Sequence, residues 1–406
     1  MFSDFMRYFK SDFVYPVSSL PVRDGILVTD DAGVIADLID PVRRKEEHDQ
    51  VIRNMPELET RHGILCPGFI NAHCHLELSH LKDRLTEKQK LPAFLRQVST
   101  LRQVTEDEIF SAQETADAEM SAQGIVAVGD ISNTDHSFLL KGKSKIRYFT
   151  FVEAFDFHPD RAFDVFGKTK ELFLKLSGMG LDGSIVPHAP YTVSAKLLKL
   201  INDFVYDSGG PVSIHNQETA SENAMFRERS GELFDFLNSA TPFYQDWKPT
   251  GFASLASTLV HLPKCNKIQL VHNTFSQAED INWAHLYSML VWWCFCPGAN
   301  LFIEDRLPDV PLFMSLAAKI TIGTDSYASN WSLSVLDELK RIHLTYPQIS
   351  LQDLLTWATL NGAEFLGYHR VLGSFEKGKK PGINLIHDMD TETSQLTSSS
   401  GVVALI

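Results

Sequence analysis

"PGFINAHCHLELS", residues 67–79, places two histidines, His73 and His75, at the end of an apolar run. The run is typical of a strand, in which residues two apart lie on the same face. Both imidazoles therefore point the same way, and two converging neutral imidazoles are the beginning of a metal site. Because His-x-His pairs also occur on ordinary solvent-facing strands, the metal interpretation depends on further ligands elsewhere in the chain.

Seven further strand-like runs follow, and helical stretches separate them. The runs are "GIVAVGDIS" (124–132), "RYFTFVEA" (147–154), "GSIVPH" (183–188), "PVSIHN" (211–216), "KIQLVHN" (267–273), "MLVWWCFCP" (289–297) and "KITIGTDS" (319–326). Eight strands alternating with helices over about 300 residues predict an α/β fold, a (β/α)8 TIM barrel. A doubly wound sheet is the structural alternative, but the glycine-rich G-x-G-x-x-G turn expected after its first strand is absent.

The helical stretches are typical of amphipathic helices that cover such strands. They include residues 92–104, 194–209, 222–239 and 332–344. A further helix is expected to begin at Ser350, because Asp353 three residues later completes a capping signal. Gly367 is expected to end it.

Both ends of the chain are rich in short strands broken by Pro, Asp and Gly. Examples are "GILVTD" (25–30) and "GVIADLID" (33–40) near the start, and "VVALI" (402–406) at the end. We therefore predict a small β-sandwich domain that both termini build. Its expected parts are residues 1–66 and 368–406, and the barrel domain is expected to comprise residues 67–367.

The bulk composition excludes several classes of partner. The 44% apolar and 22% charged residues are those of an ordinary globular protein. A net charge of −14 argues against a nucleic acid partner. No apolar window is long enough to span a membrane, and no signal peptide is evident. Five cysteines without a C-x-x-C pair favour a reduced, cytoplasmic protein. We expect a small-molecule substrate and allow for a homodimer.

Polar residues at the ends of later strands supply the missing ligands. His215 ends the fifth predicted strand, His272 the sixth and Asp325 the eighth. Because a TIM barrel gathers its chemistry at the carboxyl ends of its strands, these side chains are expected at one site with His73 and His75. Each residue taken alone could be a hydrogen-bonded structural residue, but this interpretation is hard to sustain for four histidines and an aspartate at once.

Several motifs resemble the amidohydrolase superfamily, over essentially the whole chain and in the family's order. They are "PGFINAHCHLEL" (67–78), "PHAPYTVS" (187–194), "HNQETASE" (215–222), "LVHN" (270–273), "CPGANL" (296–301), "IGTDSYASN" (322–330), "LNGAEFLG" (360–367) and "GSFEKGKKPGINLI" (373–386). The most similar branch holds chlorohydrolases, guanine deaminase and deaminases of adenosine-like compounds.

The resemblance implies one divalent metal, Zn²⁺ first and Fe²⁺ as the alternative. The implied ligands are His73, His75, His215 and Asp325. Binuclear relatives bridge two metals with a carbamylated lysine on strand four, and "GSIVPHAP" contains no lysine.

The resemblance also implies catalytic roles. Asp325 is expected to accept a proton from the attacking water, and His272 to stabilise developing charge. Glu218, three residues after His215, is expected to carry protons to the substrate. Without the neighbouring histidines, Glu218 would be interpreted as a solvated loop residue or a helix N-terminal charge.

Other residues are assigned to substrate binding. They are His188, Glu77 and Asn300, the last expected at the end of the seventh strand. A buried salt bridge is an equal alternative for Glu77. Phe243, Tyr244 and Trp247 form either a lid or ordinary surface packing, and Ser329 and Asn330 are expected to cap the helix after the eighth strand.

The implied activity is a deaminase, a hydrolase of cyclic amidines that replaces an exocyclic amine by water and releases ammonia. The expected substrate is a 6-aminopurine nucleoside modified at its 5′ position, with aminodeoxyfutalosine, methylthioadenosine and adenosylhomocysteine as candidates. Guanine deamination and chlorohydrolase-type chemistry remain alternatives within the enzyme class. A non-catalytic barrel scaffold is the alternative from another class.

Overall fold

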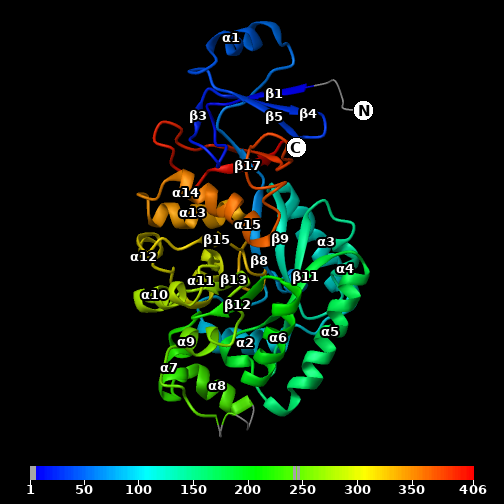
Figure 1. Ribbon diagram of the computed structural model, residues 1–406, viewed down its shortest axis with the longest axis vertical. Helices are drawn as coiled ribbons and strands as arrows, with labels where there is room; N and C mark the ends of the chain where they lie inside the picture. Colours follow the sequence, from blue (N-terminus) through cyan, green and yellow to red (C-terminus); the bar gives the residue numbers. More distant parts are fainter. Residues whose placement is uncertain (1–5, 241–243, 245–246) are drawn as a thin grey trace. The chain divides into compact units, whose positions relative to one another are not determined.

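The computed structural model describes residues 6–240, 244 and 247–406 (Figure 1). The chain divides into two compact units, which are described separately below. We call them the terminal unit, with residues 1–71, 118–127 and 334–406, and the central unit, with residues 72–117 and 128–333.

Two four-stranded sheets organise the middle of the chain. The first has the order β11-β10-β9-β8, from β8 (Phe69–Cys74), β9 (Ile125–Ser132), β10 (Arg147–Ala154) and β11 (Asp182–Pro187). The second runs in chain order through β12 (Val212–Asn216), β13 (Ile268–His272), β14 (Val291–Phe295) and β15 (Ile320–Ile322). The eight predicted strands are present, and the pairs from β12 to β15 are parallel. The predicted α/β class with parallel strands is confirmed.

Helices occupy the connections between these strands. They are α2 (Lys90–Leu101), α3 (Glu106–Ala122), α4 (Phe138–Lys141), α5 (Ala162–Gly178), α6 (Ala195–Ser208), α7 (Ala220–Glu228), α8 (Glu232–Ala240), α9 (Ser254–Leu259), α10 (Ala278–Tyr287), α11 (Pro297–Glu304) and α12 (Val310–Ser315). Helices α5 and α6 pack against β11 (Figure 1). The stretch 222–239, predicted as helical throughout, is two helices, because Arg229 and Gly231 both take positive φ values and turn the chain.

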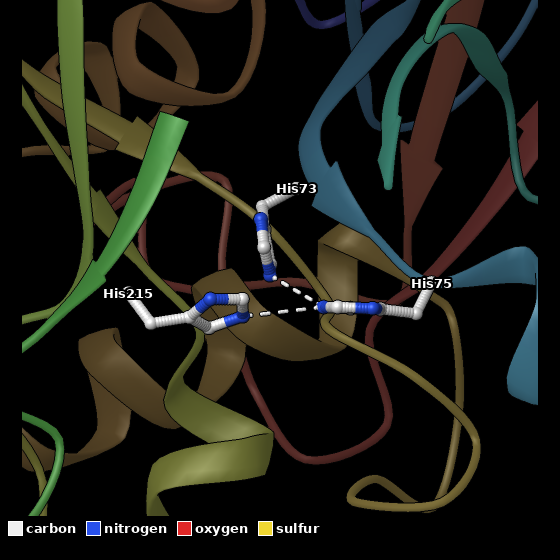
Figure 2. Close-up of side chains that lie close together, drawn as sticks. All are labelled: His73, His75 and His215. Atoms are coloured by element: carbon white, nitrogen blue, oxygen red, sulfur yellow. Dashed lines mark hydrogen bonds between the residues drawn. The ribbon is translucent and has the colours of Figure 1, made fainter. Parts of the chain in front are cut away.

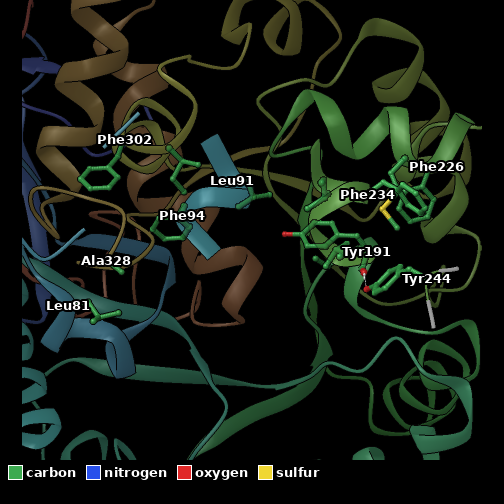
Figure 3. Close-up of a cluster of buried hydrophobic side chains, with 14 residues drawn as sticks. Leu81, Leu91, Phe94, Tyr191, Phe226, Phe234, Tyr244, Phe302 and Ala328 are labelled. Carbon is green, nitrogen blue, oxygen red and sulfur yellow. Dashed lines mark hydrogen bonds between the residues drawn. The ribbon is translucent and has the colours of Figure 1, made fainter. Parts of the chain in front are cut away.

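A buried apolar cluster of the central unit fixes helix α2 (Figure 3). Leu91 and Phe94 of α2 belong to this cluster together with Phe226 of α7 and Phe302 of α11. The backbone N–H of Leu91 donates a hydrogen bond of 2.9 Å to the side chain of Glu304, also on α11. Apolar packing and this cap together hold α2 against α11.

The terminal unit contains two sheets, and one of them joins the two ends of the chain. The first has the order β5-β4-β1-β6, from β1 (Met6–Lys10), β4 (Ile26–Asp30), β5 (Ile35–Ile39) and β6 (Glu59–Thr60). The second has the order β17-β16-β7-β2-β3, from β2 (Phe13–Val14), β3 (Val22–Arg23), β7 (Ile64–Pro67), β16 (Ile383–His387) and β17 (Gly401–Ala404). Strand β16 pairs antiparallel with β7, so early and late residues share one sheet.

The terminal unit also contains four α-helices, and capping residues mark where several of them begin or end. They are α1 (Lys45–Asn54), α13 (Val335–Thr345), α14 (Leu351–Thr356) and α15 (Gly362–Leu366), with a π-helical turn η5 (Trp357–Asn361) between the last two. Ser350 accepts the N–H of Asp353 at 3.1 Å, and Gly367 ends α15 at φ 84°, as predicted. The expected cap of α13 is wrong: Ser334, rather than Ser329 or Asn330, caps it by accepting the N–H of Asp337.

Two further findings concern cysteines and membrane spans. All five cysteines are free thiols, and Cys294 and Cys296 lie in a small buried cluster with Ala72 and Val271. Within the described ranges, every helix is too short or too polar to cross a membrane.

Candidate metal centre and active site

Three imidazoles converge on one point of the central unit (Figure 2). His73 lies in β8, His75 follows that strand directly, and His215 lies in β12. The Nε2 atom of His75 is 3.2 Å from Nε2 of His73 and 3.3 Å from Nε2 of His215. Four tetrahedral ligand atoms at 2.0–2.1 Å from a metal ion would lie roughly 3.3 Å apart. The observed nitrogen separations therefore match a tetrahedral ligand set.

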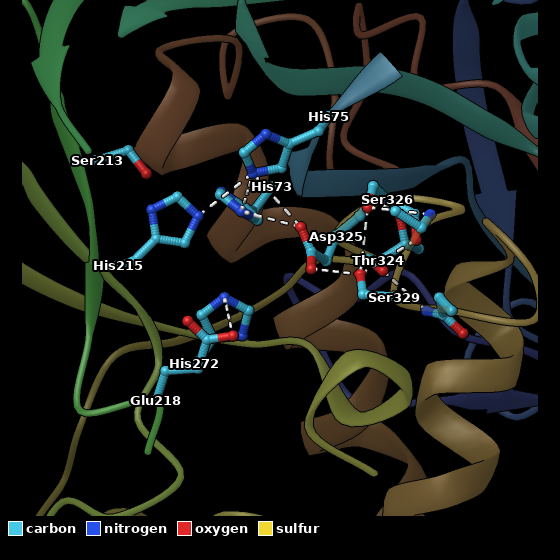
Figure 4. Close-up of polar contacts among 12 residues, drawn as sticks. His73, His75, Ser213, His215, Glu218, His272, Thr324, Asp325, Ser326 and Ser329 are labelled. Carbon is cyan, nitrogen blue, oxygen red and sulfur yellow. Dashed lines mark hydrogen bonds and ion pairs between the residues drawn. The ribbon is translucent and has the colours of Figure 1, made fainter. Parts of the chain in front are cut away.

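Asp325 adds a carboxylate to this group (Figure 4). Its Oδ1 atom lies 3.4 Å from Nε2 of His75 and 3.7 Å from Nε2 of His73. Its Oδ2 atom accepts a 2.5 Å hydrogen bond from the Ser329 hydroxyl, which leaves Oδ1 directed at the histidines. Asp325 has a φ of 56°, and such backbone strain in a non-glycine residue is typical of functional sites.

The protonation of the histidines suits a metal ligand set. Burial lowers the pKa of His75 to about 3 and holds the pKa of His215 well below its ordinary value. The Nδ1–H of His215 donates a 2.7 Å hydrogen bond to the carbonyl of His188, so its Nε2 carries a lone pair. Lone pairs that face each other repel, and a bound cation would relieve that repulsion. The donor set fits a divalent metal with nitrogen preference.

A second group of candidate ligands shares His215 with the first. It combines Glu153 of β10 with His188 and His215. Nδ1 of His215 lies 3.8 Å from Oε1 of Glu153, but its hydrogen already goes to the His188 carbonyl. The first group can use its imidazole nitrogens without breaking a hydrogen bond of His215, so the geometry favours it.

We predict about one tightly bound divalent metal per chain, and the two ligand groups make this testable. His73→Ala should abolish metal binding, whereas His188→Ala should retain it. Elemental analysis of the purified variants measures both, and circular dichroism verifies that each one is folded. The opposite pattern would place the metal at the Glu153 group, and two metals per chain would contradict the mononuclear site.

Glu218 and His272 face each other beside the ligand group (Figure 4). Oε1 of Glu218 lies 3.7 Å from Nε2 of His272. Burial raises the pKa of Glu218 well above its ordinary value, and the charges of Asp325 and Glu222 raise it further. Glu222 also accepts the backbone N–H groups of Gln217 and Glu218 at 3.0 and 3.2 Å, which fixes the loop. A protonated, buried carboxyl group beside a candidate metal site is suited to proton transfer.

The expected position of Asn300 is wrong. Strand β14 ends at Phe295, and Asn300 lies within α11 rather than at the strand end. It accepts the Nδ1–H of His272 at 3.1 Å and donates to the His272 carbonyl at 3.3 Å. Asn300 is not among the described residues that line the cavity, so it orients His272 from behind.

A cavity of about 250 Å³ opens above the candidate ligands. His188 and Glu77 line it, as expected for substrate contacts. His188 is oriented by a 2.7 Å contact between its Nδ1 and the Thr192 hydroxyl. Glu77 accepts the N–H of Asn133 at 2.9 Å, and burial raises its pKa to about 7. The charge of Arg102 lowers the pKa of Glu77 slightly against this burial, and the choice between a substrate contact and a salt bridge stays a prediction.

A buried ion pair lies behind the His-x-His segment and was missed by the sequence interpretation. Nζ of Lys141 is 2.6 Å from Oδ2 of Asp130, and both side chains are fully buried. Oδ1 of Asp130 accepts the N–H of Leu76 at 2.7 Å, directly after His75. Asp130 and Glu153 both come near the ends of predicted strands, so the strand-end rule that found His215 would have found them.

The aromatic loop residues pack away from the cavity. Tyr244 stacks on Phe157 at a centroid distance of 4.5 Å and donates its hydroxyl hydrogen to the Tyr191 carbonyl at 2.7 Å. Trp247 contacts the edge of Phe226. Phe243 lies outside the described residues. For Tyr244 and Trp247, these contacts favour the packing interpretation over a lid.

A family comparison identifies the chain. Residues 64–404 match the model of the amidohydrolase family. The chain belongs to the amidohydrolase family. An aminodeoxyfutalosine deaminase of Deinococcus radiodurans is 28% identical to this amidohydrolase over 365 residues, which cover 84% of this chain and 81% of the relative.

Solved structures support the same fold for this amidohydrolase. Aminofutalosine deaminase of Helicobacter pylori, in complex with methylthio-coformycin, superposes with a TM-score of 0.76 and 21% identity, covering 96% of this chain and 93% of that one. An adenosine deaminase of Xanthomonas campestris with bound zinc gives a TM-score of 0.73 and 21% identity, covering 96% and 86%.

Proposed function

We propose that the chain is a metal-dependent deaminase of a 6-aminopurine nucleoside. The observation that carries this proposal is the convergence of three imidazoles and Asp325 on one point, with Glu218 and His272 beside them. Membership of the amidohydrolase family and the similarity to a deaminase of an adenosine-like compound support it.

The residues divide the chemistry between them. When bound by His73, His75, His215 and Asp325, a divalent metal, Zn²⁺ or alternatively Fe²⁺, would supply Lewis-acid activation of water. Asp325 then accepts the proton of the attacking water at Oδ1. Glu218 protonates a ring nitrogen of the substrate and afterwards the departing amine, so that water and the aminopurine give an oxopurine and ammonia. His272, oriented by Asn300, is placed beside the reacting atoms to stabilise the charge that develops there.

We also propose that the two central sheets close into a (β/α)8 barrel. Two sets of backbone contacts support closure. The N–H of His215 in β12 donates to the carbonyl of His188, which follows β11, at 2.9 Å. The N–H of Thr324, which follows β15, donates to the carbonyl of His73 in β8 at 3.0 Å. Cys74 further forms a parallel bridge with Asp325. The barrel domain is proposed to comprise residues 67–367, and residues 1–66 and 368–406 are proposed to form a β-sandwich.

The proposed cellular compartment and binding partners follow from the composition and from the size of the cavity. The free thiols, four of them buried, suit the reducing cytoplasm. The net charge of −14 disfavours nucleic acid, and a cavity of about 250 Å³ suits a small molecule. A homodimer remains part of the proposal and is testable by the molar mass in solution.

A substrate panel tests the proposed reaction. Ammonia release should be fastest with adenosine-like nucleosides modified at the 5′ position, such as methylthioadenosine, adenosylhomocysteine and aminodeoxyfutalosine. Guanine and a chlorinated triazine serve as the alternative substrates. If guanine is the best substrate, or if halide is released in preference to ammonia, the nucleoside proposal is wrong.

His188→Ala should separate nucleosides from free bases. The proposal places the His188 imidazole against a ribose hydroxyl or the 5′ substituent, so kcat/KM for adenosine should fall by about fivefold to tenfold, the value of one lost hydrogen bond. The value for adenine should change far less. Steady-state kinetics with both substrates measure the ratio, and equal losses would place His188 outside the sugar site.

A further inference from the structure

Two loops of the active site run side by side beyond the strands that they follow. Strand β12 ends at Asn216 and β13 ends at His272, and these two residues are paired in parallel register. Backbone hydrogen bonds continue past this pair. The N–H of Asn273 donates to the carbonyl of Asn216 at 3.0 Å, and the N–H of Phe275 donates to the carbonyl of Gln217 at 3.0 Å. The loop after β12 is therefore fixed to the loop after β13.

The Gln217 side chain connects these loops a second time. Its Oε1 atom accepts a 2.5 Å hydrogen bond from the Ser276 hydroxyl in the loop after β13. Its Nε2 atom donates to Oδ1 of Asn223 on α7 at 3.2 Å, and its backbone N–H donates to Glu222 at 3.0 Å. Gln217 and Ser276 are buried, and neither is among the described residues that line the cavity. Gln217 therefore acts on other parts of the protein rather than on a ligand.

The backbone at this junction is strained, so it depends on such contacts. Gln217, His272 and Asn273 take positive φ values of 46°, 74° and 58°. Left-handed backbone in non-glycine residues persists only where neighbouring contacts hold it, and it is typical of functional sites. Gln217 directly precedes Glu218, whose Oε1 atom lies 3.7 Å from Nε2 of His272 across the junction (Figure 4). The strained backbone thus sets where the Glu218 and His272 side chains point.

We propose that Gln217 is a positioning residue, which holds Glu218 and His272 at a fixed separation through its hydrogen bond with Ser276. The inference rests on the proposed function, because it takes Glu218 to transfer the proton and His272 to stabilise the developing charge. A group that transfers a proton has to lie within hydrogen-bond reach of its target, and a displacement of about 1 Å can cost roughly 10²-fold in rate. Loosening the junction should therefore slow the chemical step and leave substrate binding nearly unchanged.

The first test removes the Ser276 hydroxyl. Ser276→Ala should lower kcat for methylthioadenosine by about tenfold and change KM by less than about twofold. The loss should be smaller than the roughly 10²-fold effect of a 1 Å displacement, because the backbone hydrogen bonds between the loops remain. Ser276→Thr keeps the hydroxyl and should restore most of the lost kcat. Steady-state kinetics measure both parameters in variants of equal metal content.

Thr274→Val is the matched control in the same loop. The Thr274 hydroxyl is also buried, but it has no hydrogen-bond partner among the described residues. The variant deletes one buried hydroxyl between His272 and Ser276 and should leave kcat within about twofold of wild type. If Thr274→Val lowers kcat as much as Ser276→Ala does, the effect comes from packing of the loop and the Gln217 assignment is wrong.

A double variant tests whether Ser276 acts through Gln217. Gln217→Met keeps the length of the side chain but removes its donor and acceptor, so it should lower kcat at least as far as Ser276→Ala. Gln217→Met combined with Ser276→Ala should be no slower than Gln217→Met alone, because the second change removes a contact that is already lost. If the two losses multiply instead, the residues act independently and the proposed link between them is wrong.

Hydrogen exchange separates this inference from the proposed function, because it requires no turnover. Peptides that cover residues 216–222 should exchange their amide hydrogens faster in Ser276→Ala than in wild type or Thr274→Val. If wild type deaminates no nucleoside, the proposed function fails, and faster exchange confined to Ser276→Ala would still support the link between the loops. Unchanged exchange together with unchanged kcat in Ser276→Ala would overturn the positioning role of Gln217 and leave the deaminase intact.

Discussion

Glu218→Gln is expected to lower the turnover number by roughly 10²–10⁴-fold, the usual effect of removing a general acid–base group. The substitution preserves the shape of a buried side chain that lies 3.7 Å from His272. An amide cannot hold and release the proton that burial keeps on Glu218. Ammonia release under saturating substrate measures the loss, and elemental analysis should find the metal content unchanged.

The control for this variant is Glu228→Gln, an exposed glutamate on the adjacent helix α7. It makes the same glutamate-to-glutamine change ten residues away and should leave turnover within a few-fold of wild type. If Glu218→Gln also works within a few-fold, another group transfers the proton. A loss of metal from Glu218→Gln would instead point to a role in the ligand set.

Lys141→Met is expected to lower the free energy of unfolding by about 3–5 kcal/mol, because it leaves the buried Asp130 carboxylate without its cation. Lys141 also donates to the hydroxyls of Ser132 and Thr150 at 2.8 and 3.1 Å, and both acceptors would lose that partner. Urea denaturation followed by tryptophan fluorescence measures the change.

Two further variants test whether the loss of stability in Lys141→Met comes from the broken ion pair. Lys143→Met removes an exposed lysine two residues away and should change the free energy of unfolding by less than about 0.5 kcal/mol. The double variant Lys141→Met, Asp130→Asn should regain part of the loss, since the amide oxygen can still accept the Leu76 N–H without a buried charge. A double variant as unstable as the single one would show that packing dominates.

The convergence of the candidate ligands was predictable, because the rule that brings strand ends together needs only short stretches of sequence. His215, His272 and Asp325 each end a short apolar run, and parallel strands bring such ends to one edge. The same rule applied to β9 and β10 would have pointed to Asp130 and Glu153. They went unnoticed because one carboxylate inside an apolar run is not a ligand pattern in itself.

Other features depend on contacts that a sequence does not encode locally. Asn300 follows β14 in the sequence, but the short helix α11 carries it behind His272. Ser329 resembles a helix cap, yet its hydroxyl donates to Asp325. Helix α1 was missed because only His48 and Val51 are buried in it, too few to give an apolar periodicity.

The most direct test of a single catalytic metal centre is a metal titration of stripped protein. Metal-free protein should release no ammonia from a 5′-modified adenosine. As Zn²⁺ is added, the rate of ammonia release should rise in proportion to the amount of metal. The rate should reach a plateau at about one equivalent of Zn²⁺ per chain, with one ammonia formed for each oxopurine. Full activity in the metal-free protein, or a plateau at two equivalents, would contradict the account.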